Sequence, residues 1–326
     1  MATYYWVGGN GTWDSATGTT SLSTTSGGSA TFTSSTVTSS DNVIFDANSS
    51  ASSYTVTVPS SSMSMFNISV AGPTTGNVTF STSASGIGLS LSGNRLVFPA
   101  TSGIMNFNMD GISISTSQTI FTANFGNTSI PFYSGGYQPS LAFSGFGLPS
   151  ANLVLASNFN GGSIRLSSGN IDTSGYNIYT YQLDASGGIS SALTLRTSNV
   201  YVTSFNLAPI MNPNTSTLYL TSNTNQFGYL SSPSFSISGI SAGTTLNNIV
   251  CINPTYFSSG NSSAILTCNN FTLPTPNSAG SWYTSFSQMN SVVITGTLSI
   301  PAGANASMRN GIISTGDIYN ISTGTS

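Results

Sequence analysis

The sequence predicts an all-β chain whose main body is a parallel β-solenoid. Apolar and polar residues alternate with a period of two in many short segments, and helical spacing is nearly absent. Clusters of Gly, Ser, Asn and Pro separate these segments at intervals of roughly 8 to 12 residues, the spacing of short strands joined by tight turns. The strong helix formers Lys and Glu are missing, whereas β-branched Thr, Val and Ile are frequent.

Residues 1–45 are predicted to form an N-terminal cap or a docking segment. Tyr4, Tyr5, Trp6 and Trp13 surround the run Gly-Gly-Asn-Gly at positions 8–11, and a stretch rich in Ser, Thr and Gly follows. A solenoid must cover its open end because an unpaired strand edge invites aggregation, so we expect these aromatic residues to build the cap. Clustered Tyr and Trp also anchor protein interfaces, which leaves docking as the alternative.

Residues 46–205 are predicted to form the solenoid body. Alternating apolar runs recur there, as at positions 54–58, 87–91 and 105–109. In a solenoid each coil contributes two or three short strands, and inward residues stack on those of neighbouring coils. Similar apolar segments return around Ile164, Leu193 and Leu218, which predicts a degenerate repeat. β-Sandwich or jelly-roll modules are the alternative architecture.

Residues 206–326 are predicted to form further coils or a second β module. Two proline-containing stretches interrupt the pattern, at positions 208–213 and 273–276, and aromatic residues become more frequent. Exposed aromatic side chains are typical of carbohydrate-binding surfaces, since one end of the ring is apolar and the other is polar. The candidate binding residues are Tyr229 and Trp282, together with Tyr137 in the preceding segment.

The composition excludes most catalytic chemistry. Only 3% of the 326 residues are charged, the net charge is -3, and His, Lys and Glu are absent. The Ser-His-Asp and Cys-His arrangements need His, and Schiff bases and Lys-containing phosphate loops need Lys. We therefore expect a protein that is not an enzyme and has no cofactor and no metal site. Four scattered arginines on an acidic chain also predict no binding to nucleic acid.

Two pairs of aspartates are the remaining acidic candidates. Asp41 and Asp46 are predicted to be a turn residue and a strand-end residue that point to opposite faces. Asp172 and Asp184 could approach each other across neighbouring coils, and paired carboxylates can hydrolyse glycosides, which would make the protein a polysaccharide depolymerase.

The remaining reactive or charged side chains are expected to be structural. Cys251 and Cys268 are expected to be two small buried thiols, with a disulfide as the alternative. Arg165 and Arg196 are expected to face solvent or pair with Asp, with binding of acidic glycans as the alternative.

The start of the chain resembles that of a group of tailed-phage proteins, notably from marine and cyanobacterial phages. The similar stretches are Tyr-Tyr-Trp-Val-Gly-Gly-Asn-Gly-Thr-Trp-Asp at 4–14 and Ser-Asp-Asn-Val-Ile-Phe-Asp-Ala-Asn-Ser at 40–49. The opening also resembles that of some autotransporter β-helix passengers. The likeness covers about the first 50 residues. It implies a virion surface component with a β-helical body, and no defined catalytic or binding residue can be carried over to this chain.

These observations predict a non-enzymatic virion structural protein: a fibre, a spike or a capsid-decorating component. We expect it to self-associate, as a homotrimer, and to contact other virion proteins at the virion surface. A host-surface carbohydrate-binding adhesin is the alternative function. No run approaches the roughly 20 apolar residues that span a bilayer, so we expect no membrane insertion. No secretory signal is visible at the start, so either a signal was removed before this numbering or the protein leaves the cell by another route, such as assembly into a virion.

Overall fold

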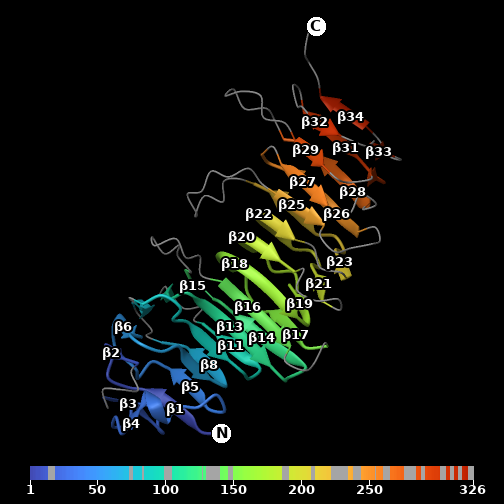
Figure 1. Cartoon of the computed structure of the whole chain (residues 1–326). Coiled ribbons are helices and arrows are strands. Elements are labelled where there is room, and N and C mark those ends of the chain that lie inside the picture. The colour runs from blue at the N-terminus through green and yellow to red at the C-terminus, as the bar shows by residue number, and fades with distance from the viewer. Residues whose placement is uncertain are drawn as a thin grey trace. The chain divides into compact units, whose positions relative to one another are not determined.

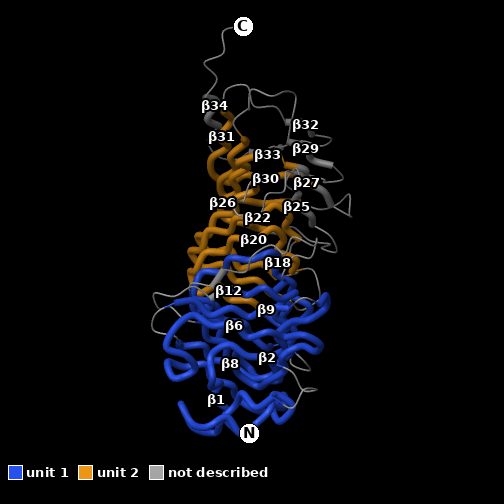
Figure 2. Tube along the Cα trace, turned by 90° about the vertical axis from the view of Figure 1, so that its left-hand side faces the viewer, with its two compact units in different colours: residues 1–170 blue, residues 171–326 orange. Residues whose placement is uncertain are grey.

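The computed structural model confirms that the chain is all-β (Figure 1). Its described part contains strands and one 3-10 helix, η1 (Ser34–Thr36), but no α-helix. The chain divides into two compact units, Met1–Asn170 and Ile171–Ser326 (Figure 2). The structure describes residues 1–13, 19–72, 76–82, 84–98, 105–126, 128–129, 140–145, 150–185, 191–206, 210–221, 234–237, 244–253, 255–259, 265–274, 284–287, 291–301, 306–308, 312–314 and 318–321.

Unit 1 consists of three parallel sheets. The first contains β1 (Thr3–Trp6), β5 (Asn42–Phe45), β8 (Asn67–Val70), β11 (Arg95–Val97), β14 (Ile120–Asn124) and β17 (Asn152–Leu155). The second contains β2 (Gly11–Thr12), β6 (Tyr54–Thr57), β9 (Val78–Ser81), β12 (Met105–Asn108) and β15 (Thr128–Ser129). The third contains β7 (Met63–Met65), β10 (Leu89–Leu91), β13 (Gly111–Thr116), β16 (Ser140–Gly145) and β18 (Phe159–Ser168).

The chain visits these sheets in rotation, which is the arrangement of a solenoid-like fold. β5, β6 and β7 add one strand to each sheet, and β8, β9 and β10 then pair with them in parallel. Asn42 lies opposite Asn67, 25 residues later, and its side-chain oxygen accepts a hydrogen bond of 3.0 Å from the Asn67 amide. Sandwich and jelly-roll modules are built from antiparallel sheets. Parallel pairing across three sheets is not the pairing of those modules.

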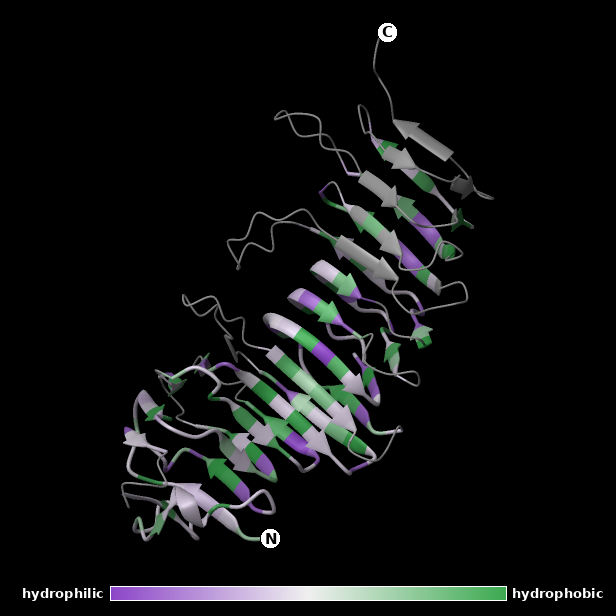
Figure 3. Ribbon diagram, viewed as in Figure 1, coloured by the Kyte–Doolittle hydropathy of each residue, from purple (hydrophilic) through white to green (hydrophobic). Residues whose placement is uncertain are grey.

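A column of aromatic rings fills the interior of unit 1. Residues that alternate along each strand point inward, so apolar stripes follow one another from strand to strand (Figure 3). Neighbouring rings have centroids between 5.1 and 6.5 Å apart, within the range of favourable aromatic pairs. In order of contact the rings are Trp13, Trp6, Phe45, Phe80, Phe107, Phe98, Phe125 and Phe159.

The free edge of β1 is covered by an antiparallel addition. β3 (Thr20–Ser23) pairs with β1, and the two-residue strand β4 (Phe32–Thr33) pairs with β3. The rings of Tyr4 and Phe32 meet edge to face at 5.5 Å, which fastens β4 to the first strand. A very short outermost strand offers few unpaired backbone groups to another chain.

Unit 2 continues with parallel pairing, and some of its strands bend between two partners. β22 (Asn199–Asn206) pairs with β24 (Thr217–Leu220) through Asn199–Val202 and with β25 (Ser234–Ile237) through Ser204–Asn206. Thr203 is buried at the bend and donates a hydrogen bond of 2.9 Å to the Thr221 carbonyl. The strands are β19 (Asn170–Asp172) at the division, β20 (Ile178–Asp184), β21 (Ala192–Thr194), β22 (Asn199–Asn206), β23 (Ile210–Asn212), β24 (Thr217–Leu220), β25 (Ser234–Ile237), β26 (Thr244–Cys251), β27 (Tyr256–Ser259), β28 (Ile265–Thr272), β29 (Thr284–Ser287), β30 (Ser291–Ile294), β31 (Leu298–Pro301), β32 (Ala306–Met308), β33 (Ile312–Ser314) and β34 (Ile318–Ile321).

The degenerate repeat through Ile164, Leu193 and Leu218 does not follow the pairing of the strands. Leu193 lies opposite Met211, and Leu218 lies opposite Val200. Each coil carries the same apolar alternation on more than one sheet, and its turns vary in length. Spacing along the chain therefore equated strands that belong to different sheets.

Candidate functional site

The N-terminal aromatic residues lie mostly inside the protein. Trp6 and Trp13 are buried and stack with ring centroids 6.2 Å apart, and Trp6 Nε1 donates a hydrogen bond of 2.9 Å to the Gly9 carbonyl. Tyr4 is also buried, whereas Tyr5 is half-buried on the outer face of β1. Three of the four rings are thus covered within unit 1, and Tyr5 alone of the four presents substantial surface.

The three aromatic residues proposed to bind carbohydrate, Tyr137, Tyr229 and Trp282, lie outside the described residues.

Asp41 stabilises the entrance to β5. One carboxylate oxygen accepts a hydrogen bond of 2.6 Å from the Ala2 backbone N–H, and the other accepts bonds from the backbone and the hydroxyl of Thr38. These hydrogen bonds, foremost that from Ala2, lower the pKa of Asp41. Asp46 follows β5 and accepts hydrogen bonds from Ser26 Oγ and the Asn48 N–H. Both carboxylates therefore organise turns.

The Asp41→Asn substitution should lower the free energy of unfolding relative to the wild type at neutral pH. The difference between the two proteins should become smaller at acid pH. The asparagine side chain has only one oxygen, and its NH2 group cannot accept the hydrogen bonds that Asp41 accepts from the backbone N–H and the hydroxyl of Thr38. Hydrogen bonds to charged groups are worth about 1.5–3 kcal/mol. Because the folded pKa is lowered, the wild-type advantage is present above the ordinary Asp pKa of about 3.9 and disappears as the pH falls through the lower folded value. Urea midpoints measured near pH 7 and near pH 2 test this; an equal difference at both pH values would contradict it.

The second aspartate pair does not form a free catalytic dyad. Asp172 accepts two hydrogen bonds from Arg196, of 3.1 Å from Nε and 2.7 Å from Nη2. Arg196 lowers the pKa of Asp172, which keeps the carboxylate ionised and unsuited to donate a proton. Asp184 ends β20, and Arg165 is exposed on β18. The pairing of Arg196 with Asp agrees with the expectation from sequence.

Both cysteines are free and buried, as the sequence predicts. Burial raises the pKa of Cys251 and of Cys268 to about 12. Only a thiolate is a good nucleophile or metal ligand. The described residues also contain no group of three or more His, Cys, Asp or Glu side chains that could hold a metal ion.

The native protein should therefore be inert to Ellman's reagent in mildly alkaline buffer, because its thiols are both covered and protonated. In concentrated urea both thiols should react, which provides the control for reagent quality and for the thiol count. Rapid release of thionitrobenzoate from the native protein would contradict the burial of these side chains.

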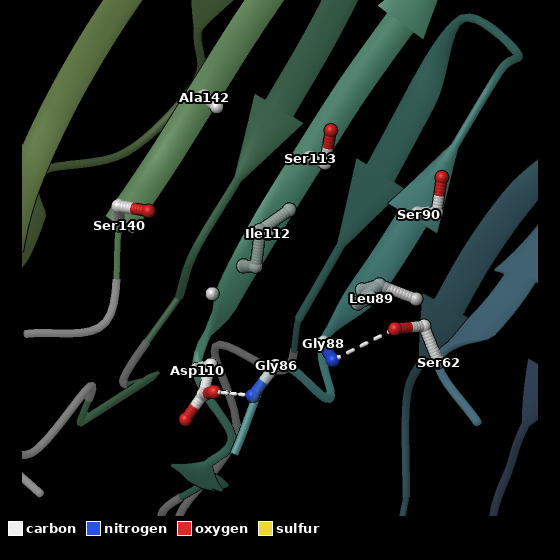
Figure 4. A pocket seen from close by; sticks show the side chains of 11 residues that line it. Ser62, Gly86, Gly88, Leu89, Ser90, Asp110, Ile112, Ser113, Ser140 and Ala142 are labelled. Carbon is white, nitrogen blue, oxygen red and sulfur yellow. Dashed lines mark hydrogen bonds between the residues drawn. The ribbon is translucent and has the colours of Figure 1, made fainter. Parts of the chain in front are cut away.

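A shallow groove of about 220 Å³ lies on the outer face of the third sheet of unit 1 (Figure 4). Ser90, Ser113 and Ala142 follow one another across β10, β13 and β16. Asp110, which accepts a hydrogen bond from the Gly86 N–H, is the one carboxylate among the described lining residues. Glycoside hydrolysis ordinarily requires two carboxylates. The described lining is a hydroxyl-rich surface without that pair.

A more distinctive surface lies on unit 2, where three tyrosines form a ladder. Tyr179, Tyr201 and Tyr219 are opposite one another on β20, β22 and β24. Their ring centroids are 4.9 and 4.4 Å apart, and the ring planes differ by only 7° and 6°. Partial burial, followed by the fields of Tyr219 and Tyr179, raises the pKa of Tyr201, so the central ring of the ladder is uncharged at neutral pH.

A row of polar side chains begins two residues before each tyrosine of the ladder and continues onto β26 and β28. Asn177, which directly precedes β20, is followed in this row by Asn199, Thr217, Asn248 and Asn270. The Asn270 amide donates to the Asn248 oxygen at 2.7 Å, and the Asn248 amide donates to the Thr217 hydroxyl at 3.2 Å. We call the ladder and this row together the tyrosine–amide strip.

Sequence reasoning missed the tyrosine–amide strip, although a signal was present. Each of the three triplets has a polar residue first, an inward apolar residue second and an outward tyrosine third. They are Asn-Ile-Tyr at 177–179, Asn-Val-Tyr at 199–201 and Thr-Leu-Tyr at 217–219. Unequal spacing hides the repeat, since the register steps are 22 and 18 residues.

Within the described residues, no helix has the length and apolar character that a bilayer-spanning segment needs. Comparison with known proteins finds no matching family model, no similar curated protein and no similar solved structure.

Proposed function

We propose that the chain is a non-enzymatic structural protein of a virion surface, a capped parallel β-solenoid that forms a fibre, a spike or a capsid-decorating component. The observation that carries the proposal is the rotation of the chain through three parallel sheets around a continuous aromatic column. Such a body places its backbone hydrogen bonds in long ladders and exposes few charges, which suits a durable coat. The resemblance of residues 4–14 and 40–49 to tailed-phage proteins supports the location on a particle.

Self-association follows from the same surface chemistry. Proteins usually resist association by carrying both signs of charge, and only 3% of these residues are charged. Neutral Ser, Thr and Asn side chains cover outward positions such as Ser90 and Ser113, and they can hydrogen-bond to a second copy without burying a charge. We expect a homotrimer, attached to other virion proteins.

Two measurements test this proposal. Mass spectrometry of gradient-purified phage particles that encode the chain should detect it as an abundant component, and its absence from intact particles would overturn the virion role.

Sedimentation equilibrium of the full chain should give three times the monomer mass of 33.5 kDa. A monomer at micromolar concentration would overturn self-association.

A second candidate function is carbohydrate binding by an adhesin. The tyrosine–amide strip favours it, because it joins aromatic surface to a row of amide and hydroxyl groups without charge. Ligand sites combine apolar or aromatic area with a small number of placed polar groups. A structural component and an adhesin are compatible roles for one chain.

A further inference from the structure

The tyrosine ladder ends at Tyr219, and this end differs from its interior. Tyr201 is stacked on both faces, by Tyr179 and by Tyr219. The next residue in register after Tyr219 is Val250 on β26, which cannot continue the stack. Among the described residues, Tyr219 stacks on no ring other than Tyr201. Within the described part of the chain, the second face of the half-buried Tyr219 ring is thus covered by no ring, and its in-register neighbour Val250 is smaller.

The residues beyond Tyr219 form a low ledge. Val250 lies opposite Thr272 on β28, and Thr272 lies opposite Ser299 on β31. All three side chains are half-buried and are shorter than tyrosine. Neighbouring strands are about 4.8 Å apart, so the ledge extends roughly 14 Å from the tyrosine row. Its length suits a short run of rings rather than one small ion.

Amide groups border this ledge. Asn248 and Asn270 precede Val250 and Thr272 by two residues on the same strands, which places them about 6.7 Å to one side. The two amides are held in line by the 2.7 Å bond from Asn270 to Asn248. Asn248 also donates to the Thr217 hydroxyl, and Asn270 also accepts a hydrogen bond of 2.9 Å from the Thr297 N–H. A side-chain amide has two N–H donors and two acceptor positions, so each of the two amides keeps one N–H and one acceptor position for a ligand.

The chemistry of the ledge selects a neutral ligand. Neither the ledge residues nor the bordering amides carry a charge, so these described residues offer no cation to an acidic sugar. A pyranose ring has an apolar face that can lie on an aromatic ring, and hydroxyl groups at its rim that can reach amides. Arrangements that join one aromatic face to a few fixed polar groups fix the orientation of such a ring.

We infer that the Tyr219 ring face turned toward Val250, the ledge at Val250 and Thr272, and the amides of Asn248 and Asn270 form a binding site for a neutral pyranose polysaccharide. The inference rests on the second candidate function, carbohydrate binding, and specifies its site and its ligand class. One sugar ring stacks on Tyr219, and the following rings lie along the ledge with hydroxyl groups toward the amides.

Affinity electrophoresis of the full chain tests the site, with dextran, laminarin and mannan as neutral polymers and alginate as the acidic one. At least one neutral polymer should retard the wild type, and alginate should not. Tyr219→Ala should weaken the interaction about tenfold, the effect of losing one aromatic contact, whereas Tyr219→Phe should keep it. Tyr176→Ala is the matched control, since it removes an exposed tyrosine ring of unit 2 that is not part of the tyrosine–amide strip.

The outcomes separate the site from the function. Retardation that survives Tyr219→Ala at full strength would overturn the site while leaving carbohydrate binding intact. A wild type that no neutral polymer retards would overturn both. A smaller sedimentation mass for Tyr219→Ala than for Tyr176→Ala would show that a second copy of the chain covers the ledge, which would also overturn the site. Circular dichroism confirms that each variant is folded.

Discussion

Phe80→Ala is expected to lower the free energy of unfolding by about 3–5 kcal/mol, the cost of emptying a fully buried aromatic site. Phe80 has no exposed surface, and its ring meets Phe45 at 5.1 Å and Phe107 at 6.5 Å. It therefore joins three successive coils in the aromatic column. Urea unfolding followed by tryptophan fluorescence measures the loss.

Ser81→Ala provides the matched control for Phe80→Ala. Ser81 is the next residue of β9 and lies on its outer face, half-buried. A substitution at such a position should change the free energy of unfolding by no more than about 0.5 kcal/mol. Equal effects of the two substitutions would contradict the assignment of inward and outward faces.

Trp6→Ala is expected to cost a comparable 3–5 kcal/mol and to loosen the N-terminal coils. Trp6 is 1% exposed, lies between Trp13 and Phe45, and bonds the Gly9 carbonyl. The adjacent Gly11 has no side chain, and an added Cβ would lie 2.7 Å from the indole ring. Urea unfolding followed by circular dichroism gives the change in stability, and limited proteolysis locates it.

Tyr5→Ala separates the cap from a docking segment. Tyr5 neighbours Trp6 but is half-buried on the outer face, so its loss should cost much less stability. If the segment serves as the cap, Trp6→Ala should destabilise the isolated protein. Unchanged unfolding of Trp6→Ala together with failure of Tyr5→Ala to enter particles would instead favour docking.

The sequence predicted the strand content and the inward faces for a clear physical reason. Alternation with a period of two is a local property, and Tyr54, Val56 and Val58 are buried as that alternation requires. Turn clusters were equally readable, since the Ser-Gly-Asn run at 92–94 does separate β10 from β11. Both signals depend only on neighbours along the chain.

The register of strand pairing and the candidate binding site could not be predicted from patterns between neighbouring residues. Which strand lies opposite β24 depends on the length of every intervening turn, and the steps vary from 18 residues before it to 31 after it. The tyrosine ladder exists only in that register. Its three aromatic residues have unequal spacings in the sequence, whereas the prediction of Tyr229 and Trp282 as binding residues rests on local aromatic density.

An electron-microscopy map of intact particles that encode this chain tests the central claim most directly. The proposal predicts surface density with three parallel sheets and coils about 4.8 Å apart, into which residues 1–170 fit with the aromatic column at the centre. Particles that lack such density, or density that shows antiparallel sandwich modules in its place, would contradict the account.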